Sequence, residues 1–221
     1  MKKKVLITTF LGKQGSGKGT QAELLVKKMG LEYVGTGDLI RERMKTKDFT
    51  GRKVKEFMLK GKLHPTCIIV GFWLDKLEEF KNKKNFKGIV FDGCPRKIIE
   101  AMMLDGALEW YEWDDNVRAV LIDISNKEAI KRLTTRRICK KCGNIIPFTL
   151  EFRSIVRCPD CGGELVKRAD DTLPAIKKRL GWFKTEVQPV INFYRKTGRL
   201  VRINGEQPIK DVFKDVLKAI K

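Results

Sequence analysis

The stretch Gly12-Lys13-Gln14-Gly15-Ser16-Gly17-Lys18-Gly19-Thr20 lies where a strand-like segment gives way to a helix-like one. Val5 to Phe10 form a short apolar, β-branched run before it, and the segment 18–29 after it has near-helical apolar spacing. A glycine-rich loop in this position lets successive backbone N–H groups, and the positive end of the following helix, face an anion. The sequence therefore predicts a phosphate-binding loop.

Two side chains of this loop have the chemistry of nucleotide binding. Lys18 is placed to reach the β- and γ-phosphates as a movable charge, and Thr20 to bring a hydroxyl near the metal. In the general pattern the hydroxyl residue follows the lysine directly, whereas Gly19 intervenes here. A dinucleotide-binding fingerprint does not fit, because the glycine spacing differs and no acidic residue is suitably placed after a second strand.

The rest of the chain alternates strand-like and helix-like segments. Further strand-like runs occur at Glu32 to Val34, Gly88 to Phe91, Ala119 to Ile124 and Leu200 to Ile203. This alternation predicts an α/β fold, a parallel sheet flanked by helices, with ligands at the carboxyl ends of the strands. After Asp170 an apolar stripe from Ile176 to Ile191 predicts one long helix, with Pro174 in its first turn.

Length and composition predict one sizeable core with a small inserted module, since the chain has 221 residues of which 42% are hydrophobic. The start Met1-Lys2-Lys3-Lys4 leads into an apolar run that is too short for a signal peptide or a membrane span. Six cysteines divide into a spaced group of four and the single Cys67 and Cys94, which is not the layout of a disulfide scaffold. We therefore expect a cytoplasmic protein without membrane partners.

A net charge of +20 favours an anionic partner, such as a nucleotide, a nucleic acid or a lipid surface. Much of the excess is lysine on segments that should form solvated helix faces. Charge alone does not distinguish these partners.

Four cysteines form two knuckles, Cys139-Lys-Lys-Cys142-Gly and Cys158-Pro-Asp-Cys161-Gly. This spacing predicts a closed tetrahedral zinc site with four thiolate ligands and a structural role. Two metal-free cysteine pairs, or an iron–sulfur or redox site, are the less favoured alternatives. Zinc ribbons often bind nucleic acid, so the second hypothesis is a nucleic-acid-binding protein whose phosphate loop is a degenerate remnant. The intact Lys18 and the arginines scattered along the chain argue against it.

Several separated motifs, in order, resemble the adenylate kinase family of the type with a zinc-binding lid. They are Gly-Ser-Gly-Lys-Gly-Thr-Gln at 15–21, Gly-Thr-Gly-Asp-Leu-Ile-Arg at 35–41, Asp-Gly-Cys-Pro-Arg at 92–96, Gly-Lys-Leu at 61–63, Arg-Leu-Thr-Thr-Arg-Arg at 132–137, Arg-Ala-Asp-Asp at 168–171 and Arg179. The resemblance covers nearly the whole chain. It implies a P-loop NTPase-type core at 1–34, 66–136 and 168–221, a helical NMP-binding segment at 35–65 and a zinc-ribbon lid at 137–167.

The resemblance also implies an activity, reversible transfer of a phosphoryl group from Mg-bound ATP to AMP, giving two ADP. Expected ATP-binding residues are Gly15, Ser16, Gly17, Lys18, Gly19, Thr20 and Arg132. Expected AMP-binding residues are Thr36, Arg41, Arg96 and Glu100, and Asp38 and Asp92 are expected to orient the Mg²⁺ through water. Expected catalytic residues are Lys18, Arg96, Arg136, Arg168 and Arg179, and a monomer without nucleic-acid partners is favoured.

Two residues depart from the family pattern. Cys94 replaces a common phenylalanine, which we interpret as a packing change. Glu100 replaces a glutamine that recognises the acceptor base, and a carboxylate accepts hydrogen bonds but donates none. We therefore expect AMP as the main acceptor, with relaxed or guanine-tolerant selectivity.

Overall fold

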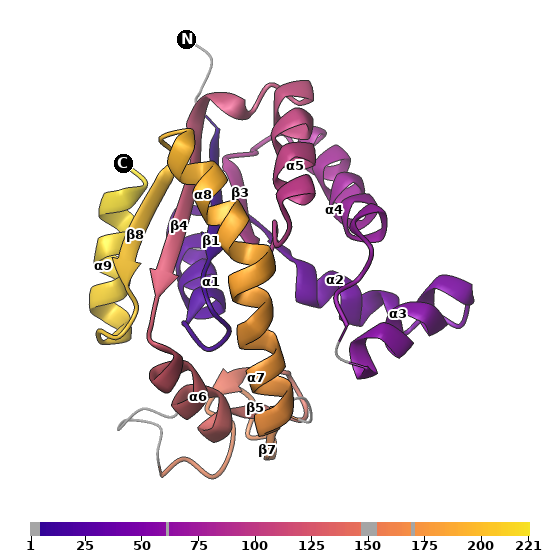
Figure 1. Cartoon of the computed structure of the whole chain (residues 1–221), viewed down its shortest axis with the longest axis vertical. Helices are drawn as coiled ribbons and strands as arrows, with labels where there is room; N and C mark the ends of the chain where they lie inside the picture. The colour runs from indigo at the N-terminus through magenta and orange to yellow at the C-terminus, as the bar shows by residue number, and fades with distance from the viewer. Residues whose placement is uncertain (1–4, 61, 147–153, 169–170) are drawn as a thin grey trace.

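The computed structural model describes residues 5–60, 62–146, 154–168 and 171–221 (Figure 1). The predicted features at Met1–Lys4, Gly61, Pro147 and Asp170 lie outside these residues. No helix in the described part is long and apolar enough to cross a membrane.

A five-stranded parallel sheet forms the centre of the molecule, in the order β2-β3-β1-β4-β8. Its strands are β1 (Leu6–Leu11), β2 (Glu32–Gly35), β3 (Gly88–Asp92), β4 (Val117–Asp123) and β8 (Leu200–Asn204). Each corresponds to a strand-like run of the sequence, with ends that differ by at most two residues. The predicted parallel α/β sheet is confirmed.

Helices cover both faces of this sheet, which keeps its strands buried as a parallel sheet requires. The helices α1 (Lys18–Met29) and α9 (Ile209–Ala219) pack on one face, where Leu25 and Val216 belong to the same core cluster as Phe10. On the other face lie α4 (Thr66–Lys81), α5 (Ile98–Trp110) and α8 (Gln188–Lys196) (Figure 1). Their core includes Trp73 of α4 and Leu104 of α5, both packed near Ile7 of β1. The short helix η1 (Asp114–Asn116) leads into β4.

Two further helices, α2 (Thr36–Arg43) and α3 (Phe49–Leu59), project to one side of the sheet (Figure 1). Ile40 of α2 and Val54 of α3 join the core cluster of α4 and α5, which fixes the position of this pair. Asp48 caps α3, because its carboxylate accepts a hydrogen bond from the backbone N–H of Gly51. The helical character predicted for this segment is confirmed.

The cysteine segment forms a small separate sheet after helix α6 (Asn126–Thr135). It has three strands in the order β6-β5-β7, namely β5 (Arg137–Cys139), β6 (Ile145–Ile146) and β7 (Leu165–Lys167), all paired antiparallel. The sheet lies at the lower end of the molecule in Figure 1, beside α6 and the lower end of α7.

The long helix expected after Asp170 is confirmed, and it contains one local change of hydrogen-bond register. Helix α7 (Leu173–Trp182) passes into a π-helical segment, η3 (Phe183–Val187), before α8 begins. The backbone N–H of Gln188 bonds to the carbonyl of Phe183, five residues back. Pro189 follows immediately and has no N–H to offer the carbonyl of Thr185, so a regular α-helical ladder cannot continue there.

Candidate functional site

A cleft of about 1180 Å³ opens at the carboxyl ends of the sheet strands. It is lined by residues of the phosphate loop, α2, the start of α5, α6, the cysteine segment and α7. The structure brings into this one cleft every residue predicted to bind nucleotide or Mg²⁺: Gly15, Ser16, Gly17, Lys18, Gly19, Thr20, Thr36, Asp38, Arg41, Asp92, Arg96, Glu100, Arg132, Arg136, Arg168 and Arg179. Residues that lie far apart in the sequence, from Gly15 to Arg179, thus line the same cleft.

The phosphate loop (residues 12–20) needs its glycines for geometric reasons. Gly15 and Gly17 have φ of 82° and 94°, in the left-handed region, and Gly17 is the N-cap of α1. A Cβ on Gly12 would lie 2.4 Å from the carbonyl oxygen of Ile122, and one on Gly19 would lie 3.3 Å from a carboxylate oxygen of Asp92. The glycine between Lys18 and Thr20 therefore keeps the first turn of α1 close to Asp92.

Lys18 lies half-buried at the base of the cleft. Its Nζ donates a hydrogen bond to the carbonyl of Lys13 at 2.9 Å. Burial lowers the pKa of Lys18 to about 8, against the opposing effect of Asp92, and the positive charges of Arg96 and Arg136 lower it further. A bound phosphate would offset the cost of burying the charged Lys18 ammonium, so the site favours a negatively charged ligand.

Lys13 anchors the loop from below, a role that the sequence pattern did not reveal. Its Nζ donates to the carbonyl of Ile124 at 2.5 Å and lies 3.5 Å from a carboxylate oxygen of Asp123. The same ammonium lies 5.1 Å from the ring centroid of Phe183 in η3. Lys13 thus ties the phosphate loop both to the end of β4 and to the helical segment that follows Arg179.

A second residue without a predicted role, Asp171, gathers two of the predicted arginines. Its carboxylate accepts hydrogen bonds at 2.8 Å from Nε and Nη2 of Arg136 and from Nη2 of Arg179. The Asp171 side chain is 3% exposed, and those of Arg136 and Arg179 are 15% and 9% exposed. The sequence signal for this role was the position of Asp171 in the motif that begins at Arg168. Clustered guanidinium groups need a counter-charge when no phosphate is bound.

The opposite side of the cleft is formed by α2 and the β3–α5 connection. Arg41 pairs with Asp38 on the surface of α2. Arg96 is held by a hydrogen bond of 2.8 Å from its Nε to the carbonyl of Gly93. Asp92 accepts a hydrogen bond from the Tyr33 hydroxyl at 3.2 Å, so the two carboxylates predicted for Mg²⁺ have different partners. Thr36, at the start of α2, is 4% exposed.

Glu100 has a contact that its predicted role did not include. It is 3% exposed, and its Oε2 accepts hydrogen bonds from the backbone N–H groups of Arg96 at 2.7 Å and Lys97 at 3.4 Å. One carboxylate oxygen therefore caps the start of α5 and fixes the backbone of Arg96. The other departure, Cys94, is fully buried in the core, as its interpretation as a packing residue requires, and burial raises the pKa of its thiol.

Arg132 spans the outer end of the phosphate loop. Its Nη2 donates to the carbonyl of Gly205 at 2.9 Å, and its Nη1 to that of Ser16 at 3.4 Å. Glu128, one helical turn earlier, holds its Nε at 2.8 Å. The loop after β8, including Gly205 and Gln207, therefore lines the cleft, which no sequence signal indicated.

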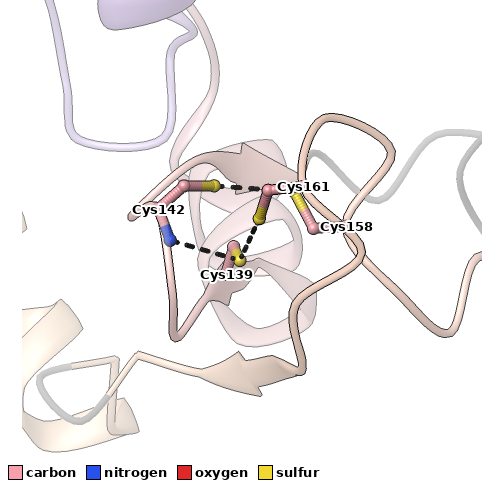
Figure 2. A group of neighbouring side chains, drawn as sticks. All are labelled: Cys139, Cys142, Cys158 and Cys161. Atoms are coloured by element: carbon pink, nitrogen blue, oxygen red, sulfur yellow. Dashed lines mark hydrogen bonds between the residues drawn. The ribbon is translucent and has the colours of Figure 1, made fainter.

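The four cysteines converge in the small sheet (Figure 2). Their sulfur atoms all lie within 4.8 Å of one another, with Cys139 and Cys161 at 3.5 Å and Cys142 and Cys158 at 3.6 Å. A tetrahedral zinc with Zn–S bonds near 2.3 Å requires S···S separations of about 3.8 Å. The backbone N–H of Cys142 is the main cause that lowers the pKa of the Cys139 thiol, to about 6. The spacing and the thiolate-stabilising N–H groups fit a metal ion such as Zn²⁺.

Comparison with known proteins agrees with the geometry of the cleft. The family model for adenylate kinase matches residues 10–199. The adenylate kinase of Caldicellulosiruptor bescii is 40% identical over 217 residues, which cover 96% of this chain and 97% of that protein. The adenylate kinases of Desulforamulus reducens and Chlamydia muridarum are 36% and 34% identical, over 96% and 100% of this chain and 98% and 89% of their own.

Proposed function

The chain belongs to the adenylate kinase family, and from this premise we propose how its own residues transfer a phosphoryl group between ATP and AMP. The observation that carries the proposal is the convergence of Lys18 and six arginines on one cleft at the carboxyl ends of the strands. Phosphoryl transfer needs in-line positioning and charge neutralisation more than covalent help. The family assignment argues against the alternative hypothesis, a nucleic-acid-binding protein whose phosphate loop is a degenerate remnant.

We assign the transferring phosphoryl group to the cationic centre of the cleft. The ammonium of Lys18 approaches the group from the phosphate loop, and Arg136, Arg168 and Arg179 approach it from the opposite wall. Arg96 holds the acceptor phosphate. Guanidinium groups suit this task because each can pair two phosphate oxygens at once.

The two nucleotides are assigned to the two ends of the cleft. ATP lies along residues 15–20 with Arg132 across its base, and AMP lies against Thr36, Arg41 and Glu100. Mg²⁺ bound with ATP would neutralise phosphate charge and hold the β- and γ-phosphates in a fixed geometry. Asp92, beside Gly19 at the end of β3, and Asp38 are the carboxylates proposed to orient its water ligands.

We further propose that two segments move against the core during the reaction. The core consists of residues 1–34, 66–136 and 168–221, the acceptor-binding segment of residues 35–65 and the lid of residues 137–167. Closure of the two mobile segments over the cleft would exclude water, so that the phosphoryl group reaches AMP instead of being hydrolysed. Zn²⁺ on the four thiolates would hold the lid together, because so small a segment cannot build a hydrophobic core of its own.

A coupled assay of each nucleoside triphosphate against AMP, GMP, CMP and UMP tests the assignment. We expect ATP with AMP to give the highest kcat/KM, with measurable GMP use if Glu100 contacts the base. Lys18→Ala should lower kcat/KM, which corresponds to an activation free energy higher by about 3 kcal/mol or more. Lys28→Ala, an exposed lysine in the last turn of the same helix, is the matched control. Wild-type turnover by Lys18→Ala would contradict the proposed mechanism.

A further inference from the structure

The Lys13 side chain is charged but lies outside the cleft. Its neighbours in the phosphate loop, Gln14 and Gly15, line the cleft, whereas Lys13 is not among the described residues that do so. The Lys13 side chain is only 15% exposed. An ammonium so far removed from water is costly unless it has partners of its own. The structure provides three kinds of partner beneath the loop: a carbonyl, a carboxylate and an aromatic ring.

The backbone of Lys13 contacts Lys18, the lysine proposed to bind the transferring phosphoryl group. The Lys13 carbonyl accepts a hydrogen bond of 2.9 Å from Nζ of Lys18 and one of 3.2 Å from the backbone N–H of Ser16. The side chain of Lys13 holds this peptide in place, because its Nζ donates to the carbonyl of Ile124 at 2.5 Å, just beyond the end of β4. The position of Lys13 therefore decides where the ammonium of Lys18 rests.

The ammonium of Lys13 also contacts the helical segment that follows Arg179. Its Nζ lies 5.1 Å from the ring centroid of Phe183, the first residue of η3, within the range of a cation–π contact. The backbone N–H of Phe183 donates to the carbonyl of Arg179, so the two residues belong to one helical turn. Phe183 also packs against the core cluster that contains Leu11 and Val190. Lys13 is therefore connected to Arg179 through a ring that the core holds in place.

Close packing does not by itself fix the distance between the phosphate loop and α7. Lys18 and Arg179 both line a pocket of about 50 Å³ at this place, together with Phe183. The chain also changes its hydrogen-bond register at η3, one turn after Arg179. Segments with this wider turn occur frequently at functional sites. A pocket and an irregular turn leave α7 free to shift here unless another contact restrains it, and the contact of Lys13 with Phe183 does so.

We propose that Lys13 is a positioning residue for phosphoryl transfer, a role that rests on the function proposed above. It fixes the phosphate loop, which carries Lys18, against the turn of α7 that carries Arg179. Because these two cations bind the transferring phosphoryl group from opposite walls, the distance between them decides how well the group is placed in line. A misplacement of about 1 Å lowers the transfer rate about 100-fold. A lysine suits this position because its compact ammonium can meet a carbonyl, a carboxylate and a ring at once.

Single-turnover kinetics at several ATP concentrations test this role, because they separate the transfer step from ATP binding and product release. Lys13→Met should lower the transfer rate by about 10- to 100-fold and change the Kd for ATP by less than about threefold. Phe183→Leu keeps an apolar side chain but removes the ring, and should lower the rate by about 3- to 10-fold. The double variant should be no slower than Lys13→Met, since the contact can be lost only once. Two matched controls should keep the wild-type rate. They are Lys184→Met, an exposed lysine of η3, and Phe193→Leu, whose ring centroid lies 5.6 Å from the Arg199 guanidinium.

All rates are compared well below the melting temperature of every variant, so that a loss of stability does not lower them. A wild-type transfer rate in Lys13→Met would overturn the proposal even if its melting temperature fell, because Lys13 would then only stabilise the fold. So would two rate losses that multiply in the double variant. Phe183→Leu leaves the hydrogen bonds of Lys13 in place, so a wild-type rate there would overturn the proposal even if Lys13→Met failed to fold. If Lys18→Ala is inactive while Lys13→Met keeps the wild-type rate, the proposed function stands without this role for Lys13. Failure of the proposed function would show instead as full transfer activity in Lys18→Ala.

Discussion

Replacement of Asp171 by asparagine probes how the cationic cleft is held together before substrates bind. The carboxylate accepts three hydrogen bonds at 2.8 Å, two from Arg136 and one from Arg179. Asparagine keeps nearly the same shape but has no charge, and its amide group presents a donor to one guanidinium. Two cations that shared a counter-charge are then left next to each other.

The burial of these side chains sets the magnitude. With Asp171 3% exposed, and Arg136 and Arg179 15% and 9% exposed, solvent screens the three charges only weakly. Breaking a buried ion pair costs about 3 to 5 kcal/mol. Asparagine retains one acceptor, so we expect the free energy of unfolding to fall by about 3 kcal/mol.

The kinetic effect should separate binding from chemistry. Arginines displaced by about 1 Å lower the rate of transfer by about 100-fold. The arginines keep their positive charge and still attract phosphate, so KM for ATP should stay the same or fall while kcat drops. Urea denaturation and steady-state kinetics of the same protein preparation measure both effects.

The matched control is Asp105→Asn. Asp105 also pairs with an arginine, Arg199, but the pair lies away from the cleft with side chains that are 27% and 21% exposed. We expect it to cost at most about 1 kcal/mol of stability and to leave kcat unchanged. If Asp171→Asn kept wild-type kcat, or raised KM with kcat intact, Asp171 would not be what positions the two arginines for the transfer step.

Three further predictions concern the pH dependence of stability, the cysteine site and the acceptor base. Burial lowers the pKa of Lys18 to about 8 in the folded state, against an ordinary value of 10.5. The folded protein therefore binds fewer protons than the unfolded chain between these pH values. The free energy of unfolding should therefore rise with pH across this window, by about 3 kcal/mol relative to Lys18→Met. Urea denaturation of both proteins at several pH values measures this, and an equal pH dependence in the two would contradict the burial of a charged lysine. Cys142→Ser should lower the melting temperature and the zinc content, as measured by scanning calorimetry and metal analysis, whereas Cys67→Ser should change neither. Glu100→Gln should keep the cap on Arg96 through its amide oxygen and raise the kcat/KM ratio of AMP over GMP about tenfold, and an unchanged ratio would show that Glu100 does not read the base.

The order of elements could be predicted from the sequence because local patterns determine it. The glycines of the phosphate loop, the β-branched runs and the helical spacing after Lys18 each act within a few residues. The parallel sheet follows from their alternation, and the cysteine site from the spacing of two knuckles. Motif order along the chain was also enough to identify the family, since each motif is a short run of residues.

The π-helical turn at Phe183–Val187 escaped this reasoning, because an apolar stripe continues through an insertion that changes only the hydrogen-bond register. The role of Lys13 could not be predicted, because its partners Ile124 and Phe183 come close to it only in the folded chain. Asp171 likewise became a counter-charge only when two arginines from different helices met it.

The sequence by itself determined which elements form, the phosphate loop and the set of residues that line the cleft. Tertiary structure decided which of those charges are buried, which share a partner and which face remains exposed. The physical reason is range: helix and strand patterns are set by neighbours along the chain. The pKa of Lys18 and the cap that Glu100 makes depend on groups that only the folded chain brings into contact.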